Sequence, residues 1–160
     1  MSEVIGFLWK ALMVLLTLGA VIYAGERAMS GNKDGNDLSN ITQLSLNIKN
    51  LYSGSANYST LTNAAALSAG KVVPDSMKSG GSIVNAFAGT VTVGPNANPS
   101  MYDINSAGIP QDSCIHELTS VGGVISVKAN GTTLTPPVDG AAAAAACNLA
   151  TGNTLIFTYN

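Results

Sequence analysis

Val4–Ala24 reads VIGFLWKALMVLLTLGAVIYA, an apolar run interrupted by a single charge, Lys10. At about 1.5 Å per residue, an α-helix over this run would be roughly 30 Å long, the thickness of a bilayer's hydrocarbon core. Because lipid cannot satisfy backbone N–H and C=O groups, the run is expected to be helical wherever it meets lipid. A cleaved secretory signal begins with a basic region, whereas Met1, Ser2 and the acidic Glu3 precede this run. We therefore expect a membrane-spanning helix that the protein keeps.

The rest of the chain is polar but carries little charge. Of the 160 residues, 10% are charged and the formal net charge is −2, whereas about a quarter of the residues are charged in an average protein. Nucleic-acid binding requires clustered Lys and Arg to neutralise phosphates, and the sequence has no such cluster, so we expect no nucleic-acid partner. Beyond the apolar run there is room for one domain of about 110–130 residues.

Cys114 and Cys147 are the only cysteines, 33 positions apart. A metal site would need more ligands at closer spacing, so in an oxidising compartment one disulfide is the favoured interpretation. By the chain-entropy argument, closing a loop of this size stabilises the folded domain by about 4 kcal/mol.

A second helical pattern follows the apolar run. Leu38, Ile41, Leu44, Ile48 and Leu51 recur every three or four residues, which is typical of one helix face packed on a core. A single long helix, apolar first and amphipathic later, explains both parts. Gly31 and Gly35 weaken it locally, so a bend or a break into two helices near residues 31–37 stays open.

Three short helices are expected in the polar body. Residues 59–70 predict a helix with one of its first two residues as N-cap and Gly70 as its end. Another is expected to open near Pro110 and to carry Cys114. Residues 141–146 are six alanines, which form either a helical turn or a flexible loop; the helix propensity of alanine favours the turn.

Alternating apolar residues predict the strands. Thr90–Val93 and Met101–Ile104 flank a segment rich in turn formers and indicate a hairpin. Val124–Val127 and Thr132–Leu134 flank Asn130-Gly131, a pair that suits a type I′ turn. With Leu155–Tyr159 as the last strand, four or five mostly antiparallel strands would pack on the amphipathic helix and give an α+β fold.

Glu3 and Lys10 are the charges at or within the apolar run, and each has two interpretations. Glu3 either lies at the headgroup level without a role or places its charge near a helix N-terminus and a free α-amino group. Lys10 either extends toward the membrane interface or pairs with Glu3 of a neighbouring chain.

Two motifs around the apolar run resemble the N-terminal half of type IVb pilins, namely MSEVI at residues 1–5 and AGERA at residues 24–28. The resemblance continues through the polar body to the late cysteine pair. It is closest to the major pilins of conjugative-plasmid and enterobacterial type IVb pili. It implies the type IV pilin fold, with Cys114 and Cys147 enclosing the variable C-terminal region of that family.

The same resemblance implies how the protein is processed and assembled. A prepilin peptidase would remove a short basic leader, and Met1 would then be N-methylated. The subunit would wait in the inner membrane until the pilus assembly machinery extracts it into a helical filament, whose core is the bundled N-terminal helices. In the family, a glutamate neutralises the N-terminal amine of the adjacent subunit, and this role passes to Glu3.

One position departs from the family pattern. The glutamate usually stands at the fifth mature position, whereas Glu3 stands two residues earlier. Either the helix start is shortened and Glu3 takes the role, or two residues precede Met1 in the mature protein. Lys10 is also atypical, and we expect Met1, Glu3 and Lys10 to be the assembly residues.

No catalytic or metal-binding pattern stands out. His116 is the single histidine, and its neighbour Glu117 would point elsewhere on a helix. The sequence contains neither a G-x-S-x-G motif nor a phosphate-binding loop. We therefore expect no enzyme activity, no cofactor and no metal.

The sequence predicts the major structural subunit of a type IVb pilus, which is a homopolymer on the bacterial surface. Residues 1–30 would be the assembly and transmembrane helix, and residues 31–160 the globular α+β head. The filament would serve adhesion, aggregation or conjugative mating through a host or recipient-cell receptor that the sequence does not identify. The alternatives are a minor pilin or pseudopilin, and a monomeric membrane-anchored periplasmic binding module.

Overall fold

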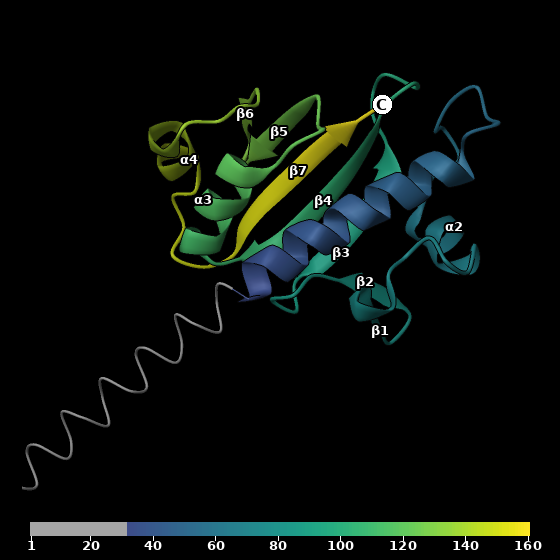
Figure 1. Ribbon diagram of the computed structural model, residues 1–160, viewed down its shortest axis with the longest axis horizontal. Coiled ribbons are helices and arrows are strands. Elements are labelled where there is room, and N and C mark those ends of the chain that lie inside the picture. The colour runs from purple at the N-terminus through teal and green to yellow at the C-terminus, as the bar shows by residue number, and fades with distance from the viewer. Residues whose placement is uncertain (1–31) are drawn as a thin grey trace, which may run out of the picture. The chain divides into compact units, whose positions relative to one another are not determined.

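A computed structural model describes residues 32–160 of the chain. The predictions for the membrane-spanning helix and for Met1, Glu3 and Lys10 lie outside these residues. Lys33–Asn160 form one compact unit, drawn in colour in Figure 1. Within residues 32–160, no helix combines the length and the apolar character that crossing a bilayer requires.

The first described element is the helix of residues 32–51, which continues through Gly35 without a break. Its predicted face is confirmed where Ile41, Leu44 and Ile48 are fully buried. The prediction for Leu51 is wrong, because this side chain is 44% exposed. Leu51 is the last helical residue, and the chain then turns so that Tyr52 packs against the core in its place.

A seven-stranded sheet lies behind this helix, and every neighbouring pair of its strands is antiparallel. The order across the sheet is β1-β2-β3-β4-β7-β5-β6, and Figure 1 shows the helix crossing one face. The strands are β1 (Lys78–Ser79), β2 (Ser82–Val84), β3 (Thr90–Pro95), β4 (Tyr102–Ile109), β5 (Ser126–Ala129), β6 (Thr132–Leu134) and β7 (Asn153–Tyr159).

The last strand, β7, fills the centre of the sheet between β4 and β5. Because β4 and β5 both run antiparallel to β7, they are parallel to each other, and the chain needs a crossover between them. The crossover contains α3 (Gln111–Ser120), which packs against β7 and against α4 (Gly140–Ala146). Both helices lie at the β5–β6 end of the sheet (Figure 1).

Two details differ from the expected elements. The sheet has seven strands instead of the predicted four or five, because β1 and β2 are two and three residues long and too short to show an alternating pattern. The helix expected over residues 59–70 is the shorter α2 (Asn63–Ser68), and its N-cap is Thr62, whose hydroxyl accepts a bond from the Ala65 N–H. The predicted hairpins and the alanine helix are confirmed, the latter capped by Asp139.

A row of tyrosines connects the end of the helix to the middle of the sheet. The rings of Tyr52, Tyr58, Tyr102 and Tyr159 follow one another with centroid separations of 5.3, 4.6 and 5.5 Å. Tyr102 is fully buried and donates a hydrogen bond of 2.9 Å to the backbone carbonyl of Ser45. Burial raises the pKa of the Tyr102 hydroxyl to about 12. The hydroxyl therefore stays a hydrogen-bond donor and fixes the helix on the sheet.

Candidate functional site

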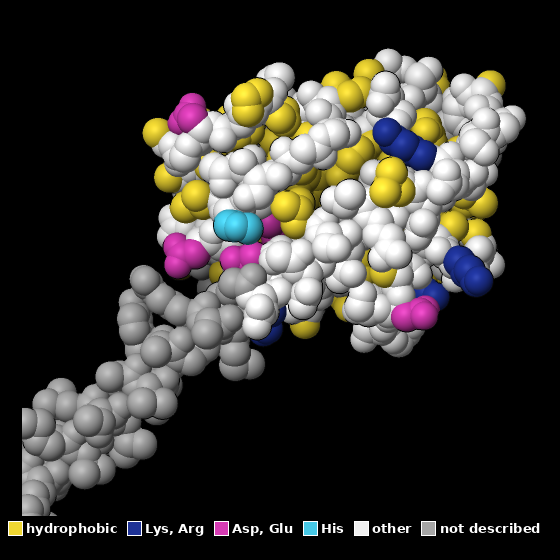
Figure 2. All heavy atoms as spheres, viewed as in Figure 1, with side chains coloured by type: hydrophobic (Ala, Val, Ile, Leu, Met, Phe, Trp, Pro, Cys, Tyr) yellow, Lys and Arg dark blue, Asp and Glu magenta, His cyan; other side chains and the backbone are white. Residues whose placement is uncertain are grey.

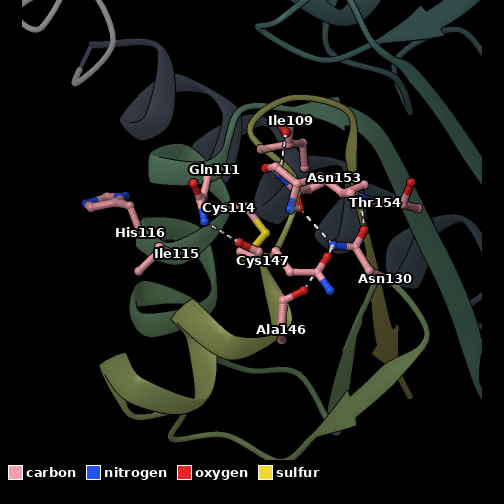
Figure 3. Close-up of a disulfide and its surroundings, with 12 residues drawn as sticks. Ile109, Gln111, Cys114, Ile115, His116, Asn130, Ala146, Cys147, Asn153 and Thr154 are labelled. Atoms are coloured by element: carbon pink, nitrogen blue, oxygen red, sulfur yellow. Dashed lines mark hydrogen bonds between the residues drawn. A yellow bond between two sulfur atoms is a disulfide. The ribbon is translucent and has the colours of Figure 1, made fainter.

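The predicted disulfide is present between Cys114 and Cys147. Cys114 lies on α3, Cys147 is the C-cap of α4, and their Cα atoms are 5.9 Å apart. Both residues are fully buried. Gln111, one turn before Cys114, donates a hydrogen bond of 2.8 Å from its side chain to the Cys147 carbonyl (Figure 3). The disulfide therefore joins two helices that a side-chain bond also connects.

Asn130 extends the pairing of β5 with β7 by one residue. Its backbone N–H donates to the Thr154 carbonyl, and its side-chain Oδ1 accepts from the Thr154 N–H, each at 3.0 Å. The Asn130 Nδ2 group donates to the Ala146 carbonyl at 2.9 Å and to Oδ1 of Asn153 at 2.8 Å. Asn130 therefore joins the β5–β6 turn to α4 and to the first residue of β7.

Asn153 is the buried centre of this amide network. Its Nδ2 donates to the carbonyls of Ile109 and Leu149, at 3.0 and 2.7 Å, and its Oδ1 accepts from the Leu149 N–H as well as from Asn130. Two donors and two accepted bonds use the full capacity of one carboxamide. Figure 3 shows the network beside the disulfide, so that covalent and polar links hold the same region.

Three carboxyl groups meet between the helix of residues 32–51 and α3. Asp37 and Glu117 are fully buried, and Asp34 is 8% exposed. Oδ1 of Asp37 accepts a 2.8 Å bond from the Ala86 N–H, but Oδ2 of Asp37 and both carboxyl oxygens of Glu117 have no donor. The one ion pair among the described residues, Lys78–Asp75, involves none of them. We call Asp34, Asp37 and Glu117 the carboxyl cluster.

Protonation resolves the missing bonds of this cluster. Burial, with the negative charge of Asp37 beside it, raises the pKa of Glu117 to about 9. Burial also raises the pKa of Asp37, although the bond from Ala86 opposes that rise. At neutral pH Glu117 is therefore a neutral carboxylic acid, which donates a hydrogen bond to Asp37. One proton thus replaces the cation that a buried carboxylate normally needs.

Surface hollows lie beside the first described helix, within residues 32–160. Three shallow hollows of about 570, 340 and 320 Å³ flank the exposed side of the helix of residues 32–51. Their walls are mainly small hydroxyl and amide side chains, with Asp75 as the one carboxylate. In the described part of the chain, no three His, Cys, Asp or Glu residues gather in a way that could hold a metal ion.

His116 and Glu117 diverge on α3, as the sequence predicts. His116 is exposed and points away from the disulfide in Figure 3, whereas Glu117 is buried. Acidic side chains lie near the histidine on the face of the head that Figure 2 shows. Neither the carboxyl cluster nor the amide network was predicted from the sequence. A signal for the first exists, because Asp34 and Asp37 continue the three- and four-residue spacing of Ile41, Leu44 and Ile48 toward the N-terminus.

Comparison with known proteins agrees with this architecture. The family described as PilS N terminal matches residues 32–160. A crystal structure of type IVb pilin from Salmonella typhi is 24% identical, with a TM-score of 0.65, covering 79% of this chain and 99% of that one. The type IV pilin TcpA from Vibrio cholerae El Tor biotype is 15% identical, with a TM-score of 0.60, covering 81% and 99% of the two chains.

An NMR structure of the Salmonella typhi type IVb pilin PilS gives 24% identity and a TM-score of 0.56, over 80% of this chain and 96% of that one. No curated protein matches the sequence. A helix packed on an antiparallel sheet, in the arrangement that these structures share, defines the fold of a type IV pilin. Through its match over residues 32–160, the chain belongs to the PilS N-terminal family of type IVb pilins.

Proposed function

We propose that this protein is the major subunit of a type IVb pilus. The observation that carries the proposal is that one chain contains both an apolar run and a pilin head. An apolar run of bilayer length at Val4–Ala24 precedes a pilin head whose first described helix is already formed at residue 32. Such a chain can leave the membrane only if its apolar surface finds new apolar contacts, and copies of the same run supply them.

For the apolar run, exchanging lipid contacts for contacts with other helices is energetically more favourable than release into water. Moving a leucine or valine side chain of the run from an apolar environment into water costs roughly 1.5–3 kcal/mol of free energy. Moving from lipid to a bundle of helices costs nearly nothing, because both surroundings are apolar. Polar groups then set the register of neighbouring subunits, and we assign this role to Glu3, with Lys10 and the amine of Met1 as its partners.

The processing and assembly steps that the resemblance to type IVb pilins implies complete the proposal. The subunit resides in the inner membrane after a prepilin peptidase has processed it, carries a methylated Met1, and is assembled by the pilus machinery into a surface filament. The filament would serve adhesion, aggregation or conjugative mating. The head contributes the outer surface of the filament, with the disulfide-bonded region between α3 and β7 available for contact.

The test is the amount of this chain in sheared surface filaments. Filaments are collected from cells carrying the intact gene and from cells carrying Glu3→Ala or Glu3→Asp, and the chain is quantified by mass spectrometry in filaments and membranes. A major pilin makes up most of the filament protein. A minor pilin would appear in a few copies per filament. A chain found only in membranes would show that it is an anchored binding module instead.

A further inference from the structure

Asn130-Gly131 is the one Asn-Gly pair in the sequence. In such a pair the backbone nitrogen of the glycine can attack the side-chain carbonyl carbon of the asparagine, because glycine has no side chain to obstruct the approach. A bond from Gly131 N to Asn130 Cγ would form while the Cγ–Nδ2 bond breaks. The Nδ2 nitrogen leaves as ammonia and takes up the Gly131 amide proton. Water then opens the cyclic imide and leaves aspartate or isoaspartate at residue 130.

The folded head holds both ends of the Asn130 carboxamide. Oδ1 is bonded to the Thr154 N–H at 3.0 Å, and Nδ2 is bonded to the Ala146 carbonyl at 2.9 Å and to Asn153 at 2.8 Å. The backbone is fixed as well, because Asn130 has a φ of +47° in the tight turn and Ala129 pairs with Thr132 across it. Cyclisation requires the side chain to leave these partners, which lie on α4 and β7 (Figure 3).

The product of the reaction does not fit the same place. An aspartate at residue 130 has no Nδ2 donor, and its negative charge would face the Ala146 carbonyl and the Oδ1 atom of Asn153. Asn153 cannot compensate by turning its amide, since its Nδ2 is already used by the carbonyls of Ile109 and Leu149. Partly buried acceptors that lose their donor cost free energy, so the modified head re-forms the network with fewer bonds and lower stability.

We propose that Asn130 is a deamidation site and that the folded head suppresses the reaction there. Deamidation then occurs when the region between the two cysteines opens locally, and the product leaves this region permanently less stable. The rate then depends on the fraction of molecules in which the turn has left α4 and β7, because only these react. A protein that is exposed outside the cell and is not replaced would therefore accumulate deamidated heads. The rate of accumulation would depend on how often this region opens.

The first experiment compares deamidation of Asn130 in the full chain, kept folded in detergent, with a peptide of residues 124–136. Both are incubated at mildly alkaline pH, and the conversion of amide to acid is followed by mass spectrometry. Four side-chain hydrogen bonds of Asn130 must break in the folded chain, so we expect deamidation to be on the order of a hundredfold slower than in the peptide. A rate within a few-fold of the peptide would overturn the protective role.

The second experiment examines the product. Asn130→Asp imitates the modified residue, and Asn130→Gly is the matched control, because it loses the side-chain bonds without adding a charge and tolerates the positive φ. We expect the Asp variant to melt at a clearly lower temperature than the Gly variant. If the Asp variant melts at the same temperature as the Gly variant or higher, the modification does not weaken closure and the proposal is wrong.

Discussion

Glu117 on α3 and Asp37 on the helix of residues 32–51 meet inside the head, and both side chains are fully excluded from solvent. Two carboxyl groups in this position cannot both be ionised without a cation, because each would keep its desolvation cost and repel the other. The pair therefore binds a proton at neutral pH and connects the first described helix to the helix that carries Cys114. The contact between these elements depends on pH for that reason.

Glu117→Gln should reduce this pH dependence. The folded pKa of Glu117, about 9, lies above its ordinary value of 4.5, so the stability it contributes is present at acid pH and is lost as pH rises through about 9. For wild type we expect the free energy of unfolding to fall by up to about 1.4 kcal/mol per pH unit between the ordinary value of 4.5 and the folded value of about 9. Glutamine keeps a donor for Asp37 and does not titrate, so the variant should be the more stable one at about pH 8.

Denaturant unfolding at several pH values measures this effect. The control is Asp112→Asn, which removes an exposed carboxyl group from the same helix and leaves the Asp37–Glu117 pair in place. A Glu117→Gln variant with the wild-type profile would mean that Glu117 is ionised in the folded head.

Removing the disulfide should weaken the head without changing its fold. Cys114→Ser opens a loop closed across 33 positions, and the chain-entropy estimate for such a loop is about 4 kcal/mol. We expect faster proteolysis of the segment between the cysteines and a lower yield of filaments. Wild type treated with a reductant is the matched sample and should lose a similar free energy of unfolding. Equal protease resistance of variant and wild type would argue against a stabilising bridge.

Gly89→Ala should be strongly destabilising. A methyl group on Gly89 would overlap the Ala107 carbonyl oxygen on β4, which also accepts a 2.7 Å bond from the Asn85 side chain. Relieving the overlap must displace backbone, at a cost of about 3 kcal/mol in the free energy of unfolding. Gly94→Ala on β3 is the control, since its methyl group would meet no atom within 4 Å. Thermal melts of both variants should separate them, and similar melting temperatures would contradict the packing described for Gly89.

Glu3→Ala should prevent or greatly slow filament formation while the head stays folded. The change removes the carboxylate that we propose to pair with a neighbouring subunit, and it lies outside the compact unit of Lys33–Asn160. Glu3→Asp retains the charge and should restore part of the piliation. The readouts are filament counts by electron microscopy and the melting temperature of the head. Normal piliation with Glu3→Ala would remove Glu3 from the assembly mechanism.

Much of the fold was predictable because local patterns coincide with the tertiary structure. Ile41, Leu44 and Ile48 mark the buried helix face, and Asn130-Gly131 marks the turn between β5 and β6. The disulfide was predictable because the sequence contains only two cysteines, which are too few for a metal site. What the sequence did not predict depends on how elements pair and pack, which no local pattern shows. β1 and β2 acquire strand structure through pairing, not through pattern.

The two polar clusters were missed for a related reason. Asp37 and Glu117 look like solvent-exposed charges until α3 is placed against the first helix, 80 residues away in sequence. Asn130 and Asn153 look like ordinary turn formers, and only the central position of β7 brings them within 2.8 Å of each other. Burial of a polar group is decided by the topology, which residue spacing alone does not encode.

The most direct test of the central claim is a helical reconstruction by electron microscopy of filaments sheared from cells that express this chain. We expect the helices of residues 4–24 to lie bundled along the filament axis, with the α+β heads and the Cys114–Cys147 bridge outside them. A filament built from another protein, or a chain that remains a single membrane-bound molecule, would contradict the account.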